Sequence, residues 1–194
     1  LLLEKGAAVE AADGDGLTAL HRAARGGHDD VARLLVARAA RVDARTSLQE
    51  TPLHLAARSN ARGVARQVLA RGASPGARDA DGLVPLQVAV EAGNQDTLEV
   101  LLAWGASADV KVADGELPLH RAAFGRHPEM VALLLSRGGV VEARSDHGDT
   151  PLHCAVKAWD NGEVVAALLG RGAQINATNA LKQTPLHLAV LMFR

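Results

Sequence analysis

The fold is decided by seven residues, Thr51-Pro52-Leu53-His54-Leu55-Ala56-Ala57, because versions of this block return along the whole chain. The versions begin at Thr18, Thr51, Val84, Leu117, Thr150 and Thr184. Their spacings are 33, 33, 33, 33 and 34 residues. A fixed period of this length is typical of stacked supersecondary units. The period therefore predicts a single solenoid, although 194 residues alone would indicate one or two globular domains.

Each version of the block predicts the start of a helix. Thr51 can cap the helix with its hydroxyl, and Pro52 follows at the first helical position, where its missing N–H costs nothing. Leu53 is expected in the core, and the alanine pair lets the next repeat approach closely. His54 has two ring nitrogens that can bind main-chain polar groups of the neighbouring turn. All of these roles are structural.

The rest of each period predicts a second helix and a loop. Apolar residues stand at helical spacing, as in Val64, Val68 and Leu69. A glycine then ends the helix, because a left-handed residue is needed there. Those glycines are Gly72, Gly105, Gly138 and Gly172, with Ala39 in the corresponding place of the earlier repeat. A polar link such as Asp79-Ala80-Asp81-Gly82 follows. One unit is therefore helix, turn, helix and a protruding hairpin-like loop.

The pattern resembles the ankyrin repeat in the Thr-Pro-Leu-His-x-Ala-Ala block, the Leu-Leu-x-x-Gly-Ala helix ending and the Asp-x-x-Gly loop. The resemblance covers essentially the whole chain. It implies an all-α solenoid of stacked antiparallel helix pairs with projecting β-hairpin-like loops. We expect one domain, 1–194, with a partial repeat at 1–15, full repeats at 16–48, 49–81, 82–114, 115–147 and 148–181, and a partial repeat at 182–194. Because both ends fall inside a repeat, we interpret the chain as a piece of a longer protein.

Three departures from the pattern are specific enough to test. Val84 and Leu117 replace the capping threonine, and Gln87 replaces the histidine, which predicts weaker helix starts in those repeats. The period of 34 residues indicates one inserted residue, which we place in the helix–helix turn at 158–162.

Composition points to an intracellular protein, in the cytoplasm or the nucleus. One cysteine excludes an internal disulfide and fits a reducing compartment. The net charge of −1 gives no general attraction to nucleic acid or membranes, and no run of about 20 apolar residues spans a bilayer. We expect a monomer with no cofactor, no nucleic-acid partner and no membrane insertion.

Catalytic and metal chemistry are not expected. Five histidines share one repeat position, but equivalent atoms of stacked helices lie roughly 8–10 Å apart, whereas one zinc ion needs ligands at about 2 Å. Cys154 occupies a packing position and has no base of its own. We therefore predict no enzyme activity, no catalytic residue and no metal site.

The resemblance places recognition at the loop tips and just after the alanine pair. The candidate partner-binding residues are Leu17, Arg25, Leu48, Glu50, Arg58, Asp81, Leu83, Glu91, Asp114, Glu116, Phe124, Asp149 and Lys157. Four of them are apolar residues for which we expect exposure, and we interpret these as candidate anchors: Leu17, Leu48, Leu83 and Phe124. The charge of residues 16–78 is +7 and that of residues 79–150 is −7. These charges are either solvated faces or two zones that a partner reads.

Asn176 is a candidate for modification. It resembles the loop asparagine that ankyrin repeats present to an asparaginyl hydroxylase, and other repeats carry Asp43, Gly76, Asp109 and Glu142 there. The alternative is an asparagine that only stabilises its loop.

The predicted function is that of a non-enzymatic protein–protein interaction scaffold, which binds its partner through the hairpin tips and the concave inner-helix surface. One alternative is a regulatory domain of a larger enzyme or channel. Another is a nucleotide- or nucleic-acid-binding ankyrin domain, which would need basic residues beside an exposed aromatic ring. Arg58 with Phe124 is the pair considered, and it is too little to favour this alternative.

Overall fold

The computed structural model describes residues 2–192, and the chain forms two compact units, residues 1–106 and 107–194. Within residues 2–192 there are eleven α-helices, two short 3-10 helices and no β-strand. None of these helices is both long enough and apolar enough to cross a membrane. The predicted all-α class is therefore confirmed.

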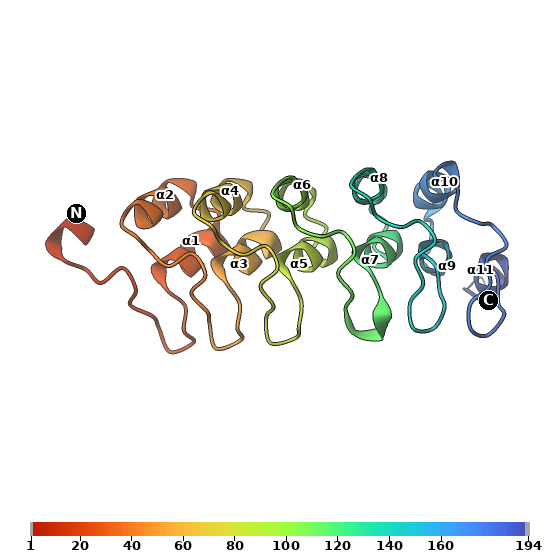
Figure 1. Ribbon diagram of the computed structural model, residues 1–194, viewed down its shortest axis with the longest axis horizontal. Coiled ribbons are helices and arrows are strands. Elements are labelled where there is room, and N and C mark those ends of the chain that lie inside the picture. The colour runs from red at the N-terminus through yellow and green to blue at the C-terminus, as the bar shows by residue number, and fades with distance from the viewer. Residues whose placement is uncertain (1, 193–194) are drawn as a thin grey trace. The chain divides into compact units, whose positions relative to one another are not determined.

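The first unit consists of three helix pairs and a short N-terminal turn. Its elements are η1 (Leu3–Lys5), α1 (Ala19–Gly26), α2 (Asp29–Ala37), α3 (Pro52–Arg58), α4 (Arg62–Ala70), α5 (Pro85–Glu91) and α6 (Gln95–Ala103). The first helices of the pairs, α1, α3 and α5, pack in chain order, and so do the second helices, α2, α4 and α6. In Figure 1 they form two rows, and the hairpin loops extend beyond the row of first helices.

The second unit repeats this arrangement. Its elements are η2 (Ala113–Gly115), α7 (Pro118–Phe124), α8 (Pro128–Ser136), α9 (Pro151–Lys157), α10 (Gly162–Gly170) and α11 (Pro185–Met192). The first helices α7, α9 and α11 pack in order, and α8 packs on α10. The period thus gave the correct position for both helices of each pair.

The histidine of the block joins one repeat to the next, as predicted. Nδ1 of His54 accepts the main-chain N–H of Thr51 at 3.1 Å, and Nε2 lies 3.1 Å from the carbonyl oxygen of Leu83. A main-chain N–H can only donate and a carbonyl can only accept, so the ring is neutral with its proton on Nε2. The Thr51 hydroxyl lies 2.9 Å from Nδ1, so it contacts the imidazole ring of His54.

Three other histidines make the same connection. Nε2 of His21 lies near the carbonyl oxygens of Ala44 and Glu50, and Nε2 of His120 lies near those of Ala143 and Asp149. Nε2 of His153 lies near the carbonyl oxygen of Gln183. All of these distances are 3.0–3.2 Å. Burial lowers the pKa of His21, His54 and His120, because it penalises the charged ring. Neutral rings suit this role, since a protonated Nδ1 could no longer accept the N–H bond.

Gln87 takes over the histidine's contact with the helix start. Its Oε1 accepts the main-chain N–H of Val84 at 3.0 Å, and both residues are buried. The helix start in this repeat therefore keeps its N–H acceptor, which sequence reasoning had treated as lost.

The extra residue lies in the helix–helix turn, as predicted. Four residues separate α9 from α10, whereas three residues separate α3 from α4. Each of these turns needs one left-handed residue, with φ of 51° at Asp160 and 54° at Asn60. Ala39 is also left-handed, with φ of 63°, at the place where Gly72 has φ of 86°.

One part of the predicted core is exposed. Val31 and Leu34 stand at the helical spacing typical of an apolar stripe on the second helix, but they are 49% and 47% exposed. The corresponding Val64 is fully buried, because α4 has helix pairs on both sides. The helices that pack most closely on α2 are α1 and α4, whereas α4 packs against second helices on both sides, α2 and α6.

Candidate functional site

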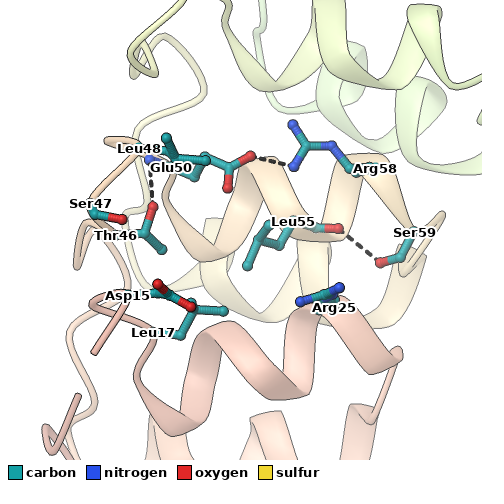
Figure 2. A pocket seen from close by; sticks show the side chains of 10 residues that line it. All are labelled: Asp15, Leu17, Arg25, Thr46, Ser47, Leu48, Glu50, Leu55, Arg58 and Ser59. Atoms are coloured by element: carbon teal, nitrogen blue, oxygen red, sulfur yellow. Dashed lines mark hydrogen bonds and ion pairs between the residues drawn. The ribbon is translucent and has the colours of Figure 1, made fainter. Parts of the chain in front are cut away.

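A pocket of about 680 Å³ opens in the first unit between two hairpins and the helices α1 and α3. It is lined by Asp15, Leu17, Arg25, Thr46, Ser47, Leu48, Glu50, Leu55, Arg58 and Ser59. Figure 2 shows the hairpin residues on one side and the helix residues on the other, with Leu55 between them. Five of the predicted binding residues meet here: Leu17, Arg25, Leu48, Glu50 and Arg58.

The pocket has an apolar surface held on a fixed backbone. Leu55 is buried, Leu17 is half-buried and Leu48 is 61% exposed. The main-chain N–H of Ser47 donates to the carbonyl of Asp15 at 2.9 Å, and that of Ala80 donates to the carbonyl of Leu48 at 2.9 Å. Each hairpin is therefore tied to the next, so a ligand would meet a surface that is already ordered.

The charges of the pocket are partly neutralised within the chain. Glu50 is buried and forms an ion pair with the half-exposed Arg58. The Ser59 hydroxyl lies 2.8 Å from the carbonyl oxygens of both Ala24 and Leu55 and can donate its one hydrogen to either, which joins α3 to α1. Arg25 differs from Arg58, because its exposed guanidinium has no hydrogen bond or ion pair with any residue in the described range.

The second unit carries the same kind of pair. Lys157 Nζ lies 2.5 Å from Oδ2 of the buried Asp149, and Asn179 Nδ2 donates to Oδ1 at 2.9 Å. Burial alone would raise the pKa of Asp149, but the bonds from Lys157 and Asn179 outweigh it and lower that pKa. Nε of Arg121 lies 2.7 Å from Glu116. Phe124 is 55% exposed at the end of α7.

Burial sorts the predicted residues into three groups, which are buried, half-buried and exposed. Glu50 and Asp149 are buried beneath the cations that they bind, so they position Arg58 and Lys157 and offer little surface of their own. Leu83 and Leu17 are half-buried, less exposed than predicted. The residues with exposed side chains are Arg25, Leu48, Arg58, Asp81, Glu91, Asp114 and Phe124.

Sequence reasoning missed the residues that shape the hairpins. Oδ1 of Asp79 accepts the main-chain N–H of Asp81 at 3.0 Å and of Leu83 at 2.9 Å. Asp13 and Asn179 make the same two bonds in their own hairpins. The Asp or Asn that begins these three polar links was the available signal, because such side chains often bind the backbone two residues later.

Asn176 lies in an exposed link after α10. At the corresponding position of other repeats, Glu10, Asp43 and Glu142 accept a main-chain N–H from the following repeat, at 2.9, 3.0 and 2.8 Å. The Asn176 side chain has no such partner in the part of the chain that the structure describes. The side-chain amide of Asn176 is therefore exposed at the protein surface.

The remaining candidates for chemistry are structural side chains. Burial raises the pKa of the Cys154 thiol to about 12, so the thiol stays protonated and unreactive at neutral pH. This confirms the predicted packing position of Cys154. Across residues 2–192, no group of three His, Cys, Asp or Glu side chains is arranged to hold a metal ion.

Comparisons with known proteins agree with this architecture. The family description "Ankyrin repeats (3 copies)" matches residues 1–79, 43–114 and 86–179. The crystal structure of the human ASB11 ankyrin repeat domain is 30% identical in sequence and superposes with a TM-score of 0.87. That match covers 97% of this chain and 84% of the ASB11 domain. No curated protein matches the sequence.

Proposed function

Because the chain belongs to the ankyrin repeat family, whose repeats generally mediate protein–protein interactions, we propose that it is a non-enzymatic scaffold that binds another protein. The contact surface in this proposal is the hairpin face, by which we mean the hairpin tips and the exposed side of the first helices. The observation that carries the proposal is the pocket in the first unit, where five predicted binding residues converge.

The hairpin face combines the properties of a protein interface. Leu48 and Phe124 are more than half exposed, and exposed large apolar side chains are typical of contact sites. Charged residues such as Arg58 and Arg121 stand beside them and are held by ion pairs. An apolar centre with a charged rim is the usual composition of such an interface.

The outer side of the second helices has a different composition. Arg33 pairs with Asp30, and Arg62 lies 3.5 Å from Glu99. Arg66 is exposed on α4 as well. Exposed ion pairs of this kind contribute little energy and mainly keep a surface hydrated. This side therefore provides matched control positions.

The remaining sequence-based expectations belong to the same proposal. They are the repeat boundaries from 16–48 to 148–181, a monomeric state, and a reducing location in the cytoplasm or the nucleus. The buried free thiol of Cys154 is compatible with such a location. No feature of the described residues favours the nucleic-acid alternative, since Arg58 is already paired with Glu50.

Capture from a cell lysate with matched variants tests the proposal. Wild-type protein, Leu48→Ala, Phe124→Ala and the control Arg66→Glu would be used as baits, with quantitative mass spectrometry as the readout. A partner should lose at least about tenfold in recovery with one of the two alanine variants and keep its recovery with the control. Partners that respond only to Arg66→Glu would place binding on the second helices and refute the proposal.

A further inference from the structure

The first helices carry a charge pattern that differs between repeats in an informative way. Arg58 stands eight residues after Glu50, and Lys157 stands eight residues after Asp149. In both repeats the buried hairpin acid binds the helix cation. Arg25 stands eight residues after Leu17, so its hairpin offers no acid. Arg25 is consequently the cation of this series that no side chain in the described part of the chain neutralises.

Arg25 also stands at the edge of an apolar surface. It lines the pocket together with Leu17, Leu48 and Leu55 (Figure 2). The two carboxylates of the pocket are not bonded to it, since Glu50 binds Arg58 and Asp15 belongs to the opposite, hairpin side. A guanidinium beside an apolar surface gains most from a carboxylate, which it can bind with two parallel hydrogen bonds.

We propose that this pocket binds a short peptide segment of the partner protein that carries an apolar side chain next to an aspartate or glutamate. The apolar side chain packs against Leu17, Leu48 and Leu55, and the carboxylate binds Arg25. This inference rests on the proposed function and narrows it to one recognition motif. The pocket volume of about 680 Å³ fits a few side chains, which is why the motif is short.

The charge balance of the pocket favours one carboxylate over a polyanion. Its lining holds two arginines, Arg25 and Arg58, and two acids, Asp15 and Glu50. A nucleic-acid backbone needs several unneutralised cations along its path, and it would meet the carboxylate of Asp15. A single carboxylate needs only Arg25. An acidic and apolar peptide is therefore the ligand class that the residues support best.

The test uses a phage-displayed random peptide library as the probe. Selections would be run in parallel on the wild-type chain, on Arg25→Glu and on the control Arg66→Glu, which reverses an equally exposed arginine outside the pocket. Wild type and control should enrich peptides with Asp or Glu within about three residues of Leu, Ile, Met or Phe. Arg25→Glu should lose the acidic preference or enrich Lys and Arg in its place.

One enriched peptide would then be synthesised and titrated against purified proteins. Arg25→Glu should raise its Kd by about tenfold or more, and Arg66→Glu by less than about twofold. Arg25 has no partner among the described residues, although it stands in the last turn of α1, so its reversal should leave the chain folded with only a small fall in melting temperature. Circular dichroism melts check this for both variants.

The outcomes separate this inference from the broader proposal. Enriched peptides without an acid, or acidic peptides that bind Arg25→Glu equally well, would overturn the inference. If those peptides still lose binding to Leu48→Ala, the hairpin face remains the binding surface. Peptides whose binding changes with neither Arg25→Glu nor Leu48→Ala would contradict both this inference and the broader proposal. A library that yields no enriched peptide would overturn the short motif, and the broader proposal would be decided by the lysate capture.

Discussion

Replacement of His54 is the sharpest test of how the repeats hold together. The ring is fully buried, accepts the main-chain N–H of Thr51 at 3.1 Å, and meets the carbonyl of Leu83 in the next repeat at 3.1 Å. His54→Ala leaves both main-chain groups without these partners and opens a cavity. His54→Gln is the matched control, because Gln87 shows that a glutamine Oε1 reaches the N–H at the same position.

The magnitude follows from these contacts. The buried N–H of Thr51 loses its acceptor, which costs about 1–3 kcal/mol, whereas the carbonyl of Leu83 keeps the N–H of Asp79 at 3.0 Å and loses one hydrogen bond worth about 0.5–1.5 kcal/mol. For His54→Ala the two groups together give a loss of about 3–5 kcal/mol in the free energy of unfolding, with the cavity included. For His54→Gln the N–H bond survives, and the expected loss is about 1–2 kcal/mol.

Urea unfolding followed by circular dichroism measures these values, and elemental analysis of the purified proteins measures bound metal. We expect the alanine variant to be the less stable one and the metal content to stay the same. A loss below about 1 kcal/mol for His54→Ala would refute the structural role, because it would mean that the two main-chain groups do not depend on the ring. A stoichiometric zinc ion that disappears with the ring would refute it independently.

Three further predictions concern pH, backbone strain and modification. Burial lowers the pKa of His21, His54 and His120 below the ordinary value of 6.5, so on acidification the unfolded chain binds protons before the folded chain does. The melting temperature, measured by calorimetry, should therefore be steady above about pH 7 and fall as the pH drops through 6.5 and below. A melting temperature that rises between pH 7 and 5 would contradict this. Ala39→Gly should raise the free energy of unfolding in urea by about 0.5–1 kcal/mol, because φ is 63° there; Gly76→Ala, at a link glycine without positive φ, is the opposite control and should not destabilise. A loss of stability in Ala39→Gly would show that the alanine methyl makes a contact worth more than the strain. Incubation with an asparaginyl hydroxylase should add one oxygen to the peptide that contains Asn176, as read by mass spectrometry; an unmodified peptide beside a modified positive control would end that idea.

The sequence was sufficient for everything that depends on local periodicity. The block at Thr51 predicted the helix starts, the role of His54 and the approach of neighbouring repeats. The 34-residue spacing predicted the longer turn before α10. These features could be predicted because each is decided by residues within about one period, and the block occurs six times.

Features that depend on neighbours in space were harder to predict. The replacement of histidine by Gln87 predicted a weaker helix start, because the pattern does not show that the Gln87 Oε1 reaches the main-chain N–H of Val84. Glu50 and Asp149 looked like surface residues, because periodicity does not show that a cation eight residues away folds back over them. Val31 looked like a core residue, although its exposure depends on what packs against the edge of α2.

Each hairpin residue stands eight positions before a residue on the first helix, and the two side chains differ from repeat to repeat. These pairs show how repeats with the same fold can present different surfaces. These pairs are Leu17 with Arg25, Glu50 with Arg58, Leu83 with Glu91, Glu116 with Phe124, and Asp149 with Lys157. Where the pair is an acid and a base, the charges bind each other. Where the hairpin residue is leucine, the charge on the helix has no partner among the described residues, as at Arg25 and Glu91. In the fourth pair Glu116 binds Arg121, and Phe124 is 55% exposed. The helix starts need neither the hairpin residue nor the helix residue of such a pair, so both residues are free to vary. The type of the hairpin residue decides whether the helix residue is neutralised within the chain or available to a partner. We therefore propose that Arg25, Glu91 and Phe124 select the partner, whereas Arg58 and Lys157 contribute to the charged rim.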